Sequence, residues 1–348
     1  MEAAVPPSVL ARYAALRDRP FRLHGTGLIN RTLLVEGRDG PVILQRLHPV
    51  FAGTVNHDIE AVTAHLAEKG LVTPRIVRTD DGALWVDGED ERPWRALTFI
   101  EGETHDRITS ACLAAEAGRL VGLFHLAVAD LTHEYRHTRA GVHDTRKHLS
   151  VLEEALRTHR DHRLYAEVAP LGRAILSAAE RLPDFGGLPL RNVHGDLKIG
   201  NLMFRDDHGL CLVDLDTLGK MVWPFEMGDA LRSWCNPSGE DEAAPSIKIP
   251  LFAASLAGYG AIARASKLIS EQEALSLVDG LSTICLELSA RFLADALREV
   301  YFGFDAARFP ARGEHNLLRA KGQFSLYESV ERQRAALEGV VRAALLGE

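Results

Sequence analysis

The fold of this chain is decided by the stretch His194-Gly195-Asp196-Leu197-Lys198-Ile199-Gly200-Asn201 and by the run that follows it, Leu210-Cys211-Leu212-Val213-Asp214-Leu215-Asp216. Apolar residues on both sides of the turn-rich segment 205–209 predict a short β-hairpin. This hairpin would fold Asp214, which lies eighteen residues after Asp196, back over the loop that carries Asp196 and Asn201. Two acids and an amide are therefore expected to converge.

Phosphoryl transfer from a nucleotide is the chemistry that needs this set of groups. One carboxylate orients the acceptor hydroxyl and takes its proton, while an amide oxygen and a second carboxylate hold the magnesium ion that bridges the phosphates. Asp196 is the candidate catalytic base, and Asn201 and Asp214 are the candidate metal ligands. Lys198, two residues after the base, would place a positive charge on the transferring phosphate. ATP and Mg²⁺ are the expected cofactors, with GTP left open as the nucleotide.

The order and spacing of these residues resemble the catalytic loop and metal-binding strand of the aminoglycoside phosphotransferase and choline kinase superfamily, whose members are relatives of the protein kinases. The resemblance implies an α+β, bilobed, protein-kinase-like fold. Residues 1–101 would form a nucleotide-binding lobe with a small antiparallel β-sheet and one helix. Residues 102–348 would form a larger, mainly helical lobe that carries catalysis and acceptor binding.

The N-terminal region contains the features expected of such a nucleotide lobe. Residues 21–36 predict two strands around a glycine turn. In a kinase-like fold the backbone amides of such a turn close over the phosphates, so Gly25 and Gly27 are candidate nucleotide contacts. A kinase binds adenine through main-chain hydrogen bonds where its sheet joins the helical region. The Thr98 carbonyl and the Ile100 amide are the candidates for that role.

The third strand, residues 41–47, lies where kinases place the lysine that binds the α- and β-phosphates, and this chain has no lysine there. Arg46, or alternatively Gln45, would take that role. Only one of them can face the cleft, because side chains alternate along a strand. An acid on the helix that follows, Asp58 or Glu60, would pair with the phosphate-binding cation, and the sequence does not choose between them.

The remaining sequence divides into a few more strands and many helices. Strands are predicted over residues 74–77, 83–86 and 94–100. Helices are predicted over residues 58–66, across 109–181, and over 250–266, 271–300 and 314–345, with breaks at Phe302-Gly303-Phe304 and Pro310. The chain therefore reads as a small sheet followed by a mainly helical region.

Within the superfamily the chain is most similar to the N-acetylhexosamine 1-kinase branch. The similarity is carried by segments such as Ile43-Leu44-Gln45-Arg46, Gly228-Asp229-Ala230-Leu231-Arg232, Arg291-Phe292-Leu293-Ala294-Asp295 and His315-Asn316-Leu317. It implies an ATP-dependent kinase whose acceptor is a sugar, most specifically the anomeric hydroxyl of an N-acetylhexosamine or hexose. The candidate acceptor contacts are Asp216, Glu287, Arg291, Tyr301 and Asn316, and Asp229 would support the catalytic loop.

Two other functions are kept as alternatives. An aminoglycoside-type or choline-type phosphotransferase would need a strongly acidic pocket with aromatic side chains for its cationic acceptor. A nucleotide-binding pseudokinase scaffold would fit the missing strand lysine. Such a scaffold has no need of a base, however, and this chain retains Asp196.

Composition narrows the classes further. The chain has 348 residues, of which 46% are hydrophobic, so it can fill a sizeable core. A net charge of −8 without a basic block argues against nucleic acid as a partner. We expect a cytoplasmic protein without a membrane partner, because no apolar run approaches eighteen residues and the first seven residues do not resemble a signal peptide. The four cysteines are far apart, which favours reduced thiols over disulfides or a zinc site.

Overall fold

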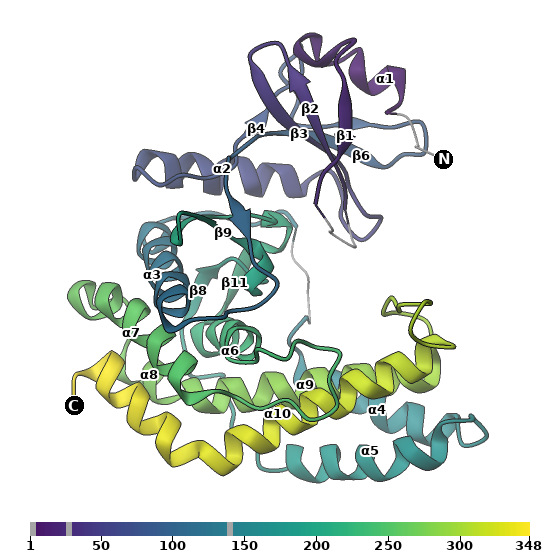
Figure 1. Ribbon diagram of the computed structural model, residues 1–348, viewed down its shortest axis with the longest axis vertical. Coiled ribbons are helices and arrows are strands. Elements are labelled where there is room, and N and C mark those ends of the chain that lie inside the picture. Colours follow the sequence, from purple (N-terminus) through teal and green to yellow (C-terminus); the bar gives the residue numbers. More distant parts are fainter. Residues whose placement is uncertain (1–4, 26–29, 138–141) are drawn as a thin grey trace.

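The computed structural model describes residues 5–25, 30–137 and 142–348 of the chain. It has two lobes, a β-sheet lobe above and a larger helical lobe below (Figure 1). The sheet is antiparallel and has the strand order β1-β2-β3-β6-β4, with β5 also paired to β6. Its strands are β1 (Phe21–Leu23), β2 (Arg31–Gly37), β3 (Gly40–Arg46), β4 (Ile76–Val77), β5 (Val86–Asp87) and β6 (Pro93–Thr98). The small antiparallel sheet predicted from the sequence is therefore confirmed.

The two faces of this sheet belong to different cores. One face packs with Val9 of the short helix α1 (Pro7–Leu10) and with Leu16 of a 3₁₀ turn in a small separate cluster. The other face is covered by α2 (Val55–Glu68), whose apolar residues follow the spacing of three and four that places them on one side of a helix. These residues of α2 belong to the same large hydrophobic cluster as the helical lobe. The helix α2 therefore connects the sheet to the lobe below it.

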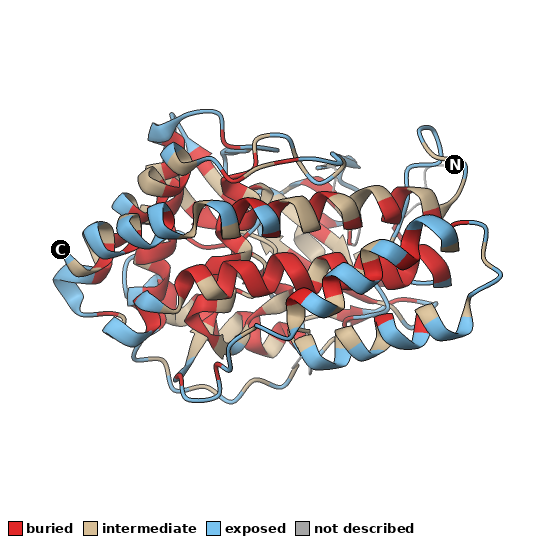
Figure 2. Ribbon diagram, turned by 90° about the horizontal axis from the view of Figure 1, so that it is seen from below, coloured by how far each residue is buried: buried red, intermediate tan, exposed pale blue. Residues whose placement is uncertain are grey.

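The lower lobe is built around α9 (Leu277–Arg298), which is buried along most of its length. Its neighbours are α4 (Thr145–Thr158), α5 (Tyr165–Ala179), α6 (Trp223–Trp234) and α10 (Arg312–Val341), which is followed by a short π-helix (Arg342–Leu346). Figure 2 shows several of these helices with one buried side and one exposed side. Helix α6 crosses α9 closely, because a Cβ on Gly280 would lie 2.2 Å from the Pro224 carbonyl oxygen. This crossing fixes the position of α6, which carries much of the site.

Helix α3 (Ala111–Val128) packs along α7 (Ile249–Ser266), and the short helix α8 (Glu271–Leu275) follows α7. A Cβ on Gly118 would lie 1.9 Å from the Ser255 carbonyl oxygen, so the two backbones touch at this glycine. By length and mean hydropathy alone, 1.4, α3 would pass for a membrane span, although Glu116 and Arg119 interrupt its apolar residues. In the structure 61% of this helix is buried inside the protein, as is usual for a core helix.

Two small sheets lie at the junction of the lobes and hold the sequence stretch described first. Strand β8 (Leu190–Val193) pairs with β11 (Gly219–Val222), and β9 (Leu202–Arg205) pairs with β10 (His208–Leu212) and with β7 (Glu103–Thr104). The predicted hairpin is confirmed, and its turn is shorter than expected. Asp206 and Asp207 form it, both with positive φ, which suits the right-handed twist of the strands. All four cysteines are free, and three of them are buried.

Candidate active site

The loop that follows β8 depends on one glycine for its path. Gly195 has φ +83°, and a Cβ there would lie 2.3 Å from the carbonyl oxygen of Thr217. The Thr217 hydroxyl donates to the carbonyl oxygen of His194 at 2.8 Å, and the His194 ring bonds the Val213 carbonyl at 2.9 Å. The loop that carries Asp196 is therefore tied directly to the segment that carries Asp214.

The three residues predicted to surround the metal lie on these two tied segments. The side-chain amide of Asn201 donates to the carbonyl oxygen of Asp196 at 2.8 Å, which leaves its own oxygen as the free ligand atom. Asp214 has φ +62° in the left-handed region, at the start of a 3₁₀ turn (Leu215–Thr217). The Lys198 ammonium lies 2.8 Å from the Asp196 carboxylate. Residues 196, 198 and 201 are therefore neighbours on one loop, and that loop is tied to the segment of Asp214; their roles as base, phosphate contact and metal ligands stay predictions.

The ionisable side chains around Asp214 and Lys198 affect one another's pKa. Burial, the negative charge of Asp216 and that of Asp196 all raise the pKa of Asp214, against the opposing effect of Lys198. Partial burial alone would lower the pKa of Lys198, but the neighbouring carboxylates, Asp196 first, raise it. A desolvated carboxylate beside two others and an amide oxygen is a donor set that suits a hard divalent cation. The donor types of Asn201 and Asp214 are ones that Mg²⁺ prefers, and these two residues stay the predicted metal ligands.

Glu226 on α6 holds the loop from below. Its carboxylate accepts from the main-chain N–H groups of His194, at 2.7 Å, and Gly195, at 2.9 Å. Its other oxygen lies 2.8 Å from Nε2 of His125, whose Nδ1 lies 3.0 Å from the Tyr259 hydroxyl. The indole of Trp234, also on α6, donates to the Leu197 carbonyl at 2.8 Å. The sequence did not single out Glu226.

The expectation that Asp229 supports this loop is corrected by the structure. The Asp229 carboxylate accepts from Arg232 at 2.8 and 2.9 Å, and Arg232 also reaches Glu240 at 3.1 Å. Burial would raise the pKa of Asp229, but Arg232, His143 and Lys198 together lower it. Asp229 therefore stays ionised through its pairing with Arg232, with the charge of Lys198 close enough to contribute.

The β3 residues divide as strand alternation requires. Gln45 faces the helical lobe and accepts from Arg95 on β6, at 2.7 Å from Nη2 and 3.0 Å from Nε. Arg46 points the other way and forms an ion pair with Asp90. Arg95, which the sequence analysis did not consider, is 1% exposed and forms an ion pair with Asp216. An arginine inside an otherwise apolar strand is the signal that could have identified it.

The acids of α2 have other partners than a phosphate-binding cation, which corrects that expectation. The Asp58 carboxylate accepts from the main-chain N–H groups of Arg136 and His137 and lies 2.8 Å from Nε2 of His133. Glu60 pairs with Arg78 at 2.8 Å on the surface. Asn56 is the α2 residue that contacts Arg95, with its side-chain oxygen 3.4 Å from Nη1.

Of the predicted nucleotide contacts, Thr98 is the last residue of β6 and Gly25 follows β1. Strand β6 ends at Thr98, so the Ile100 amide lies beyond the sheet ladder, at the join between the lobes. Gly25 has φ +75° with open space around it, and Gly27 lies outside the described residues. This arrangement leaves Thr98, Ile100 and Gly25 as candidates for nucleotide binding.

The predicted acceptor residues fall into two groups. Arg291 is 14% exposed and lies 3.7 Å from Glu287, which also accepts from the Thr145 hydroxyl at 2.7 Å. Tyr301 is 60% exposed in the loop after α9. By contrast, Asp216 is buried against Arg95, and the amide of Asn316 donates to Asp295 at 2.9 Å, inside the lobe. Arg291 and Tyr301 thus remain candidate acceptor contacts, whereas Asp216 and Asn316 are engaged within the protein.

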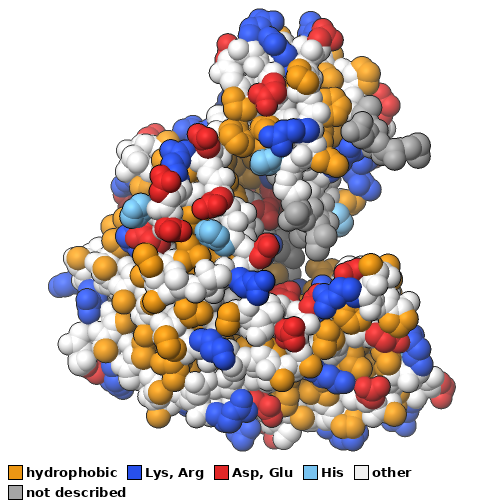
Figure 3. All heavy atoms as spheres, in the orientation of Figure 1, with side chains coloured by type: hydrophobic (Ala, Val, Ile, Leu, Met, Phe, Trp, Pro, Cys, Tyr) orange, Lys and Arg blue, Asp and Glu red, His pale blue; other side chains and the backbone are white. Residues whose placement is uncertain are grey.

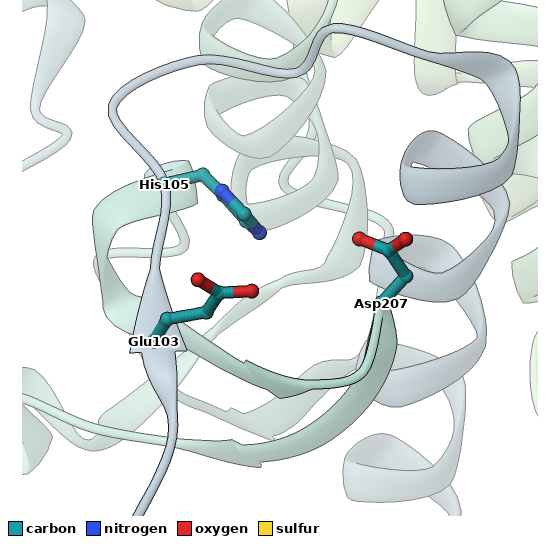
Figure 4. Close-up of side chains that lie close together, drawn as sticks. All are labelled: Glu103, His105 and Asp207. Atoms are coloured by element: carbon teal, nitrogen blue, oxygen red, sulfur yellow. The ribbon is translucent and has the colours of Figure 1, made fainter.

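The molecular surface is hollowed between the two lobes, and charged side chains of both signs line the lower edge of the hollow (Figure 3). A separate group that could hold a metal ion lies on β7 and the β9–β10 turn. Glu103, His105 and Asp207 have ligand atoms within 4.8 Å of one another, and the His105 ring points between the two carboxylates (Figure 4). Both carboxylates are exposed to water, and the group does not include Asn201 or Asp214.

A β-sheet lobe above a helical lobe, with the β9–β10 hairpin at their junction flanked by Asp196, Asn201 and Asp214, defines a protein-kinase-like fold. Residues 20–263 match the phosphotransferase enzyme family, APH. The chain therefore belongs to that family.

Solved structures agree on the fold. A microcompartment-associated aminopropanol kinase superposes with a TM-score of 0.65 at 17% identity, covering 94% of this chain and 96% of that one. An aminoglycoside phosphotransferase from Alicyclobacillus acidocaldarius gives 0.64 at 16% identity, covering 97% and 98%.

Two curated proteins similar to this chain are homoserine kinases. The enzyme of Mesorhizobium japonicum is 30% identical over 206 residues, 57% of this chain and 58% of that one. The enzyme of Bartonella henselae is 26% identical over 176 residues, 49% and 51% of the two chains. The chain thus matches little more than half the length of these relatives, and the similarity to the N-acetylhexosamine branch stays a prediction.

Proposed function

We propose that this protein is an ATP-dependent kinase that transfers the γ-phosphate to a hydroxyl group of a small polar molecule. The observation that carries the proposal is the joined pair of segments at the lobe junction. They place the Asp196 carboxylate beside Lys198 and couple it electrostatically to Asp214. A scaffold that only binds nucleotide has no use for a positioned base, so these residues favour catalysis.

Each residue of the site has a proposed role that follows from the chemistry of its side chain. Asp196 would accept a hydrogen bond from the acceptor hydroxyl and take its proton. Lys198 would hold the transferring phosphate, where its charge is worth most in a site closed to water. Asn201 and Asp214 would hold Mg²⁺, which when bound neutralises the charge of the phosphates.

For the acceptor we keep the sugar hypothesis, with the anomeric hydroxyl of an N-acetylhexosamine or hexose as its most specific form. Arg291, which is 14% exposed, offers donor groups that ring hydroxyls need, and the buried Glu287 beside it would orient the guanidinium. Tyr301 offers an exposed aromatic face. These side chains, all from the helical lobe, support the proposal that the acceptor is a polar molecule.

An amino alcohol that carries a carboxylate is the second candidate, because the homoserine kinases are relatives. The charges on the acceptor side have both signs, with Asp229 and Glu287 against Arg232 and Arg291. A purely cationic acceptor such as choline fits less well. The nearby acids Asp229 and Glu240 are already paired with Arg232.

The test is a panel of acceptors incubated with ATP and Mg²⁺, with ADP release as the readout. The panel contains N-acetylhexosamines, hexoses, homoserine, choline and an aminoglycoside. Turnover of a sugar with an acid-labile phosphate product would support a sugar 1-kinase, and turnover of homoserine alone would replace the sugar by an amino alcohol. Nucleotide binding without turnover of any acceptor would favour the scaffold reading.

A further inference from the structure

Arg95 is a buried cation at the place where the two lobes meet. In the described part of the chain up to residue 101, it is the only lysine or arginine that is buried. It lies on β6, directly opposite Gln45 of β3 in the sheet register. Burying a guanidinium is costly unless its charge is balanced and its donors are satisfied, so its surroundings should explain its presence.

Three side chains satisfy Arg95, and they do so from different elements. Gln45 accepts from Nε and Nη2, at 3.0 and 2.7 Å, and Asn56 of α2 lies 3.4 Å from Nη1. The charge is balanced by Asp216, which belongs to the helical lobe. Gln45 thus holds one edge of the guanidinium, and Nη1 is directed at the lobe below.

Asp216 brings this cation next to the proposed metal site, since it lies two residues after Asp214. Its second oxygen accepts from the side-chain amide of Asn30 at 2.5 Å, and Asn30 in turn accepts from the main-chain N–H of His48 at 3.0 Å. Asp216 is therefore held from the sheet lobe at both oxygens. Its role in the structure is that of a counter-ion for Arg95.

We propose that Arg95 is the cation that binds the α- and β-phosphates of the nucleotide, and that the phosphates take the place of Asp216 on its Nη1 side. This inference rests on the proposed kinase function. A guanidinium with one edge already held is oriented for a two-point contact with phosphate oxygens. Gln45 then positions Arg95 instead of contacting the nucleotide, and the function that β3 lacks is supplied by the neighbouring strand.

The experiment measures the Kd of ATP, ADP and adenosine by calorimetry with MgCl₂ and without an acceptor. Arg95→Met should raise the Kd of ATP and of ADP by at least about tenfold. The Kd of adenosine should stay within about twofold, because only phosphates would contact the guanidinium. Arg95→Lys should recover part of the ATP and ADP affinity. The matched control is Arg92→Gln, which replaces an exposed arginine of the same lobe that pairs with Asp90. This variant should change none of the three Kd values.

Two further variants keep the test decisive. Arg95→Met leaves Asp216 buried without its counter-ion, so the double variant Arg95→Met/Asp216→Asn should fold better and still bind ATP weakly. Asp216→Asn alone should bind ATP as tightly as the wild type or a few-fold more tightly, since it removes the competitor for Arg95.

Three results would overturn the assignment. One is an equal loss of affinity for adenosine and for ATP in Arg95→Met, which would indicate that Arg95 has a structural role. Another is wild-type ATP affinity in the double variant. The third is a loss of ATP affinity in Arg46→Gln that Arg95→Met does not share. A wild-type protein that binds neither ATP nor ADP would instead overturn the kinase function, and this assignment with it.

Discussion

Nε2 of His125 lies 2.8 Å from the Glu226 carboxylate, at the base of the loop that carries the proposed catalytic base. The two residues come from different helices, α3 and α6, and both are buried. The same carboxylate holds two main-chain N–H groups of the loop. The position of Asp196 therefore depends on a buried side chain beneath the loop.

Replacing this carboxylate should damage both stability and rate. In Glu226→Ala the buried N–H of His194 and the part-buried N–H of Gly195 lose their acceptor, so the free energy of unfolding should fall by about 2–6 kcal/mol, at roughly 1–3 kcal/mol for each unsatisfied group. Turnover should fall by more than about tenfold because the loop is no longer held. Denaturant unfolding and steady-state kinetics measure the two effects. Glu328→Ala, on an exposed face of α10, serves as the control and should stay within about 0.5 kcal/mol.

The assignment of Asp196 as the base predicts a selective loss of rate. Asp196→Asn should lower kcat by about 10²–10⁴-fold, the range of general-base catalysis, while the Kd for ATP with Mg²⁺ stays within about twofold. The matched control is Asp207→Asn in the β9–β10 turn, since asparagine also tolerates the positive φ of that position. An unchanged kcat in Asp196→Asn would remove Asp196 from the mechanism.

Gly195 and Gly339 should respond to alanine in opposite directions. At Gly195 the positive φ and the 2.3 Å approach to the Thr217 oxygen leave no room for a Cβ, so Gly195→Ala should lower stability by more than about 1 kcal/mol and turnover with it. Gly339 lies in α10 with open space around it, and Gly339→Ala should raise stability by about 0.5–1 kcal/mol. Thermal unfolding of both variants checks the signs, and equal signs would contradict the geometry.

Asp214 should show a trade between stability and metal binding. Its pKa is raised above that of the unfolded chain, so its contribution favours the folded state below the unfolded pKa and is lost as the pH rises through the folded one. Asp214→Asn should therefore raise Tm at neutral pH, by roughly 1–3 °C, while it abolishes Mg²⁺-dependent ATP binding.

The wild type should also lose Mg²⁺ affinity as the pH falls, and it should do so at a higher pH than a site built on an ordinary aspartate. Its raised pKa means that Asp214 takes up a proton before an ordinary aspartate does. Titrations of Mg²⁺ at a fixed ATP concentration, repeated at several pH values, measure this affinity. A Tm of Asp214→Asn below that of the wild type would show that the ionised carboxylate stabilises the fold.

The sequence was informative where a pattern is local. The hairpin of β9 and β10 was predicted from apolar runs around a turn, and α9 and α10 from their periodicity and their breaks. Asp196, Asn201 and Asp214 could be proposed together because a short hairpin brings near neighbours in sequence into contact. Their roles remain predictions.

Long-range pairing was beyond the sequence. Glu226 and the loop it holds are about thirty residues apart, and Arg95 and Asp216 are 121 apart. Whether Arg46 or Gln45 faces the helical lobe depends on the register of the sheet, which a single strand does not encode. The function of Asp58 depends on residues 133–137, which no periodicity connects to it.

The helix α2 lies in the hydrophobic cluster of the larger lobe, and Asp58 binds it there through three hydrogen-bond donors. If residues 1–101 were expressed alone, Ile59, Val62 and Leu66 would face water and the fragment would be prone to aggregate. A chimera that exchanges the N-terminal lobe between two relatives would need matching partners for this helix. Sequence changes in the two lobes are therefore expected to be linked. A change on the inner face of α2 calls for a compensating change in α3.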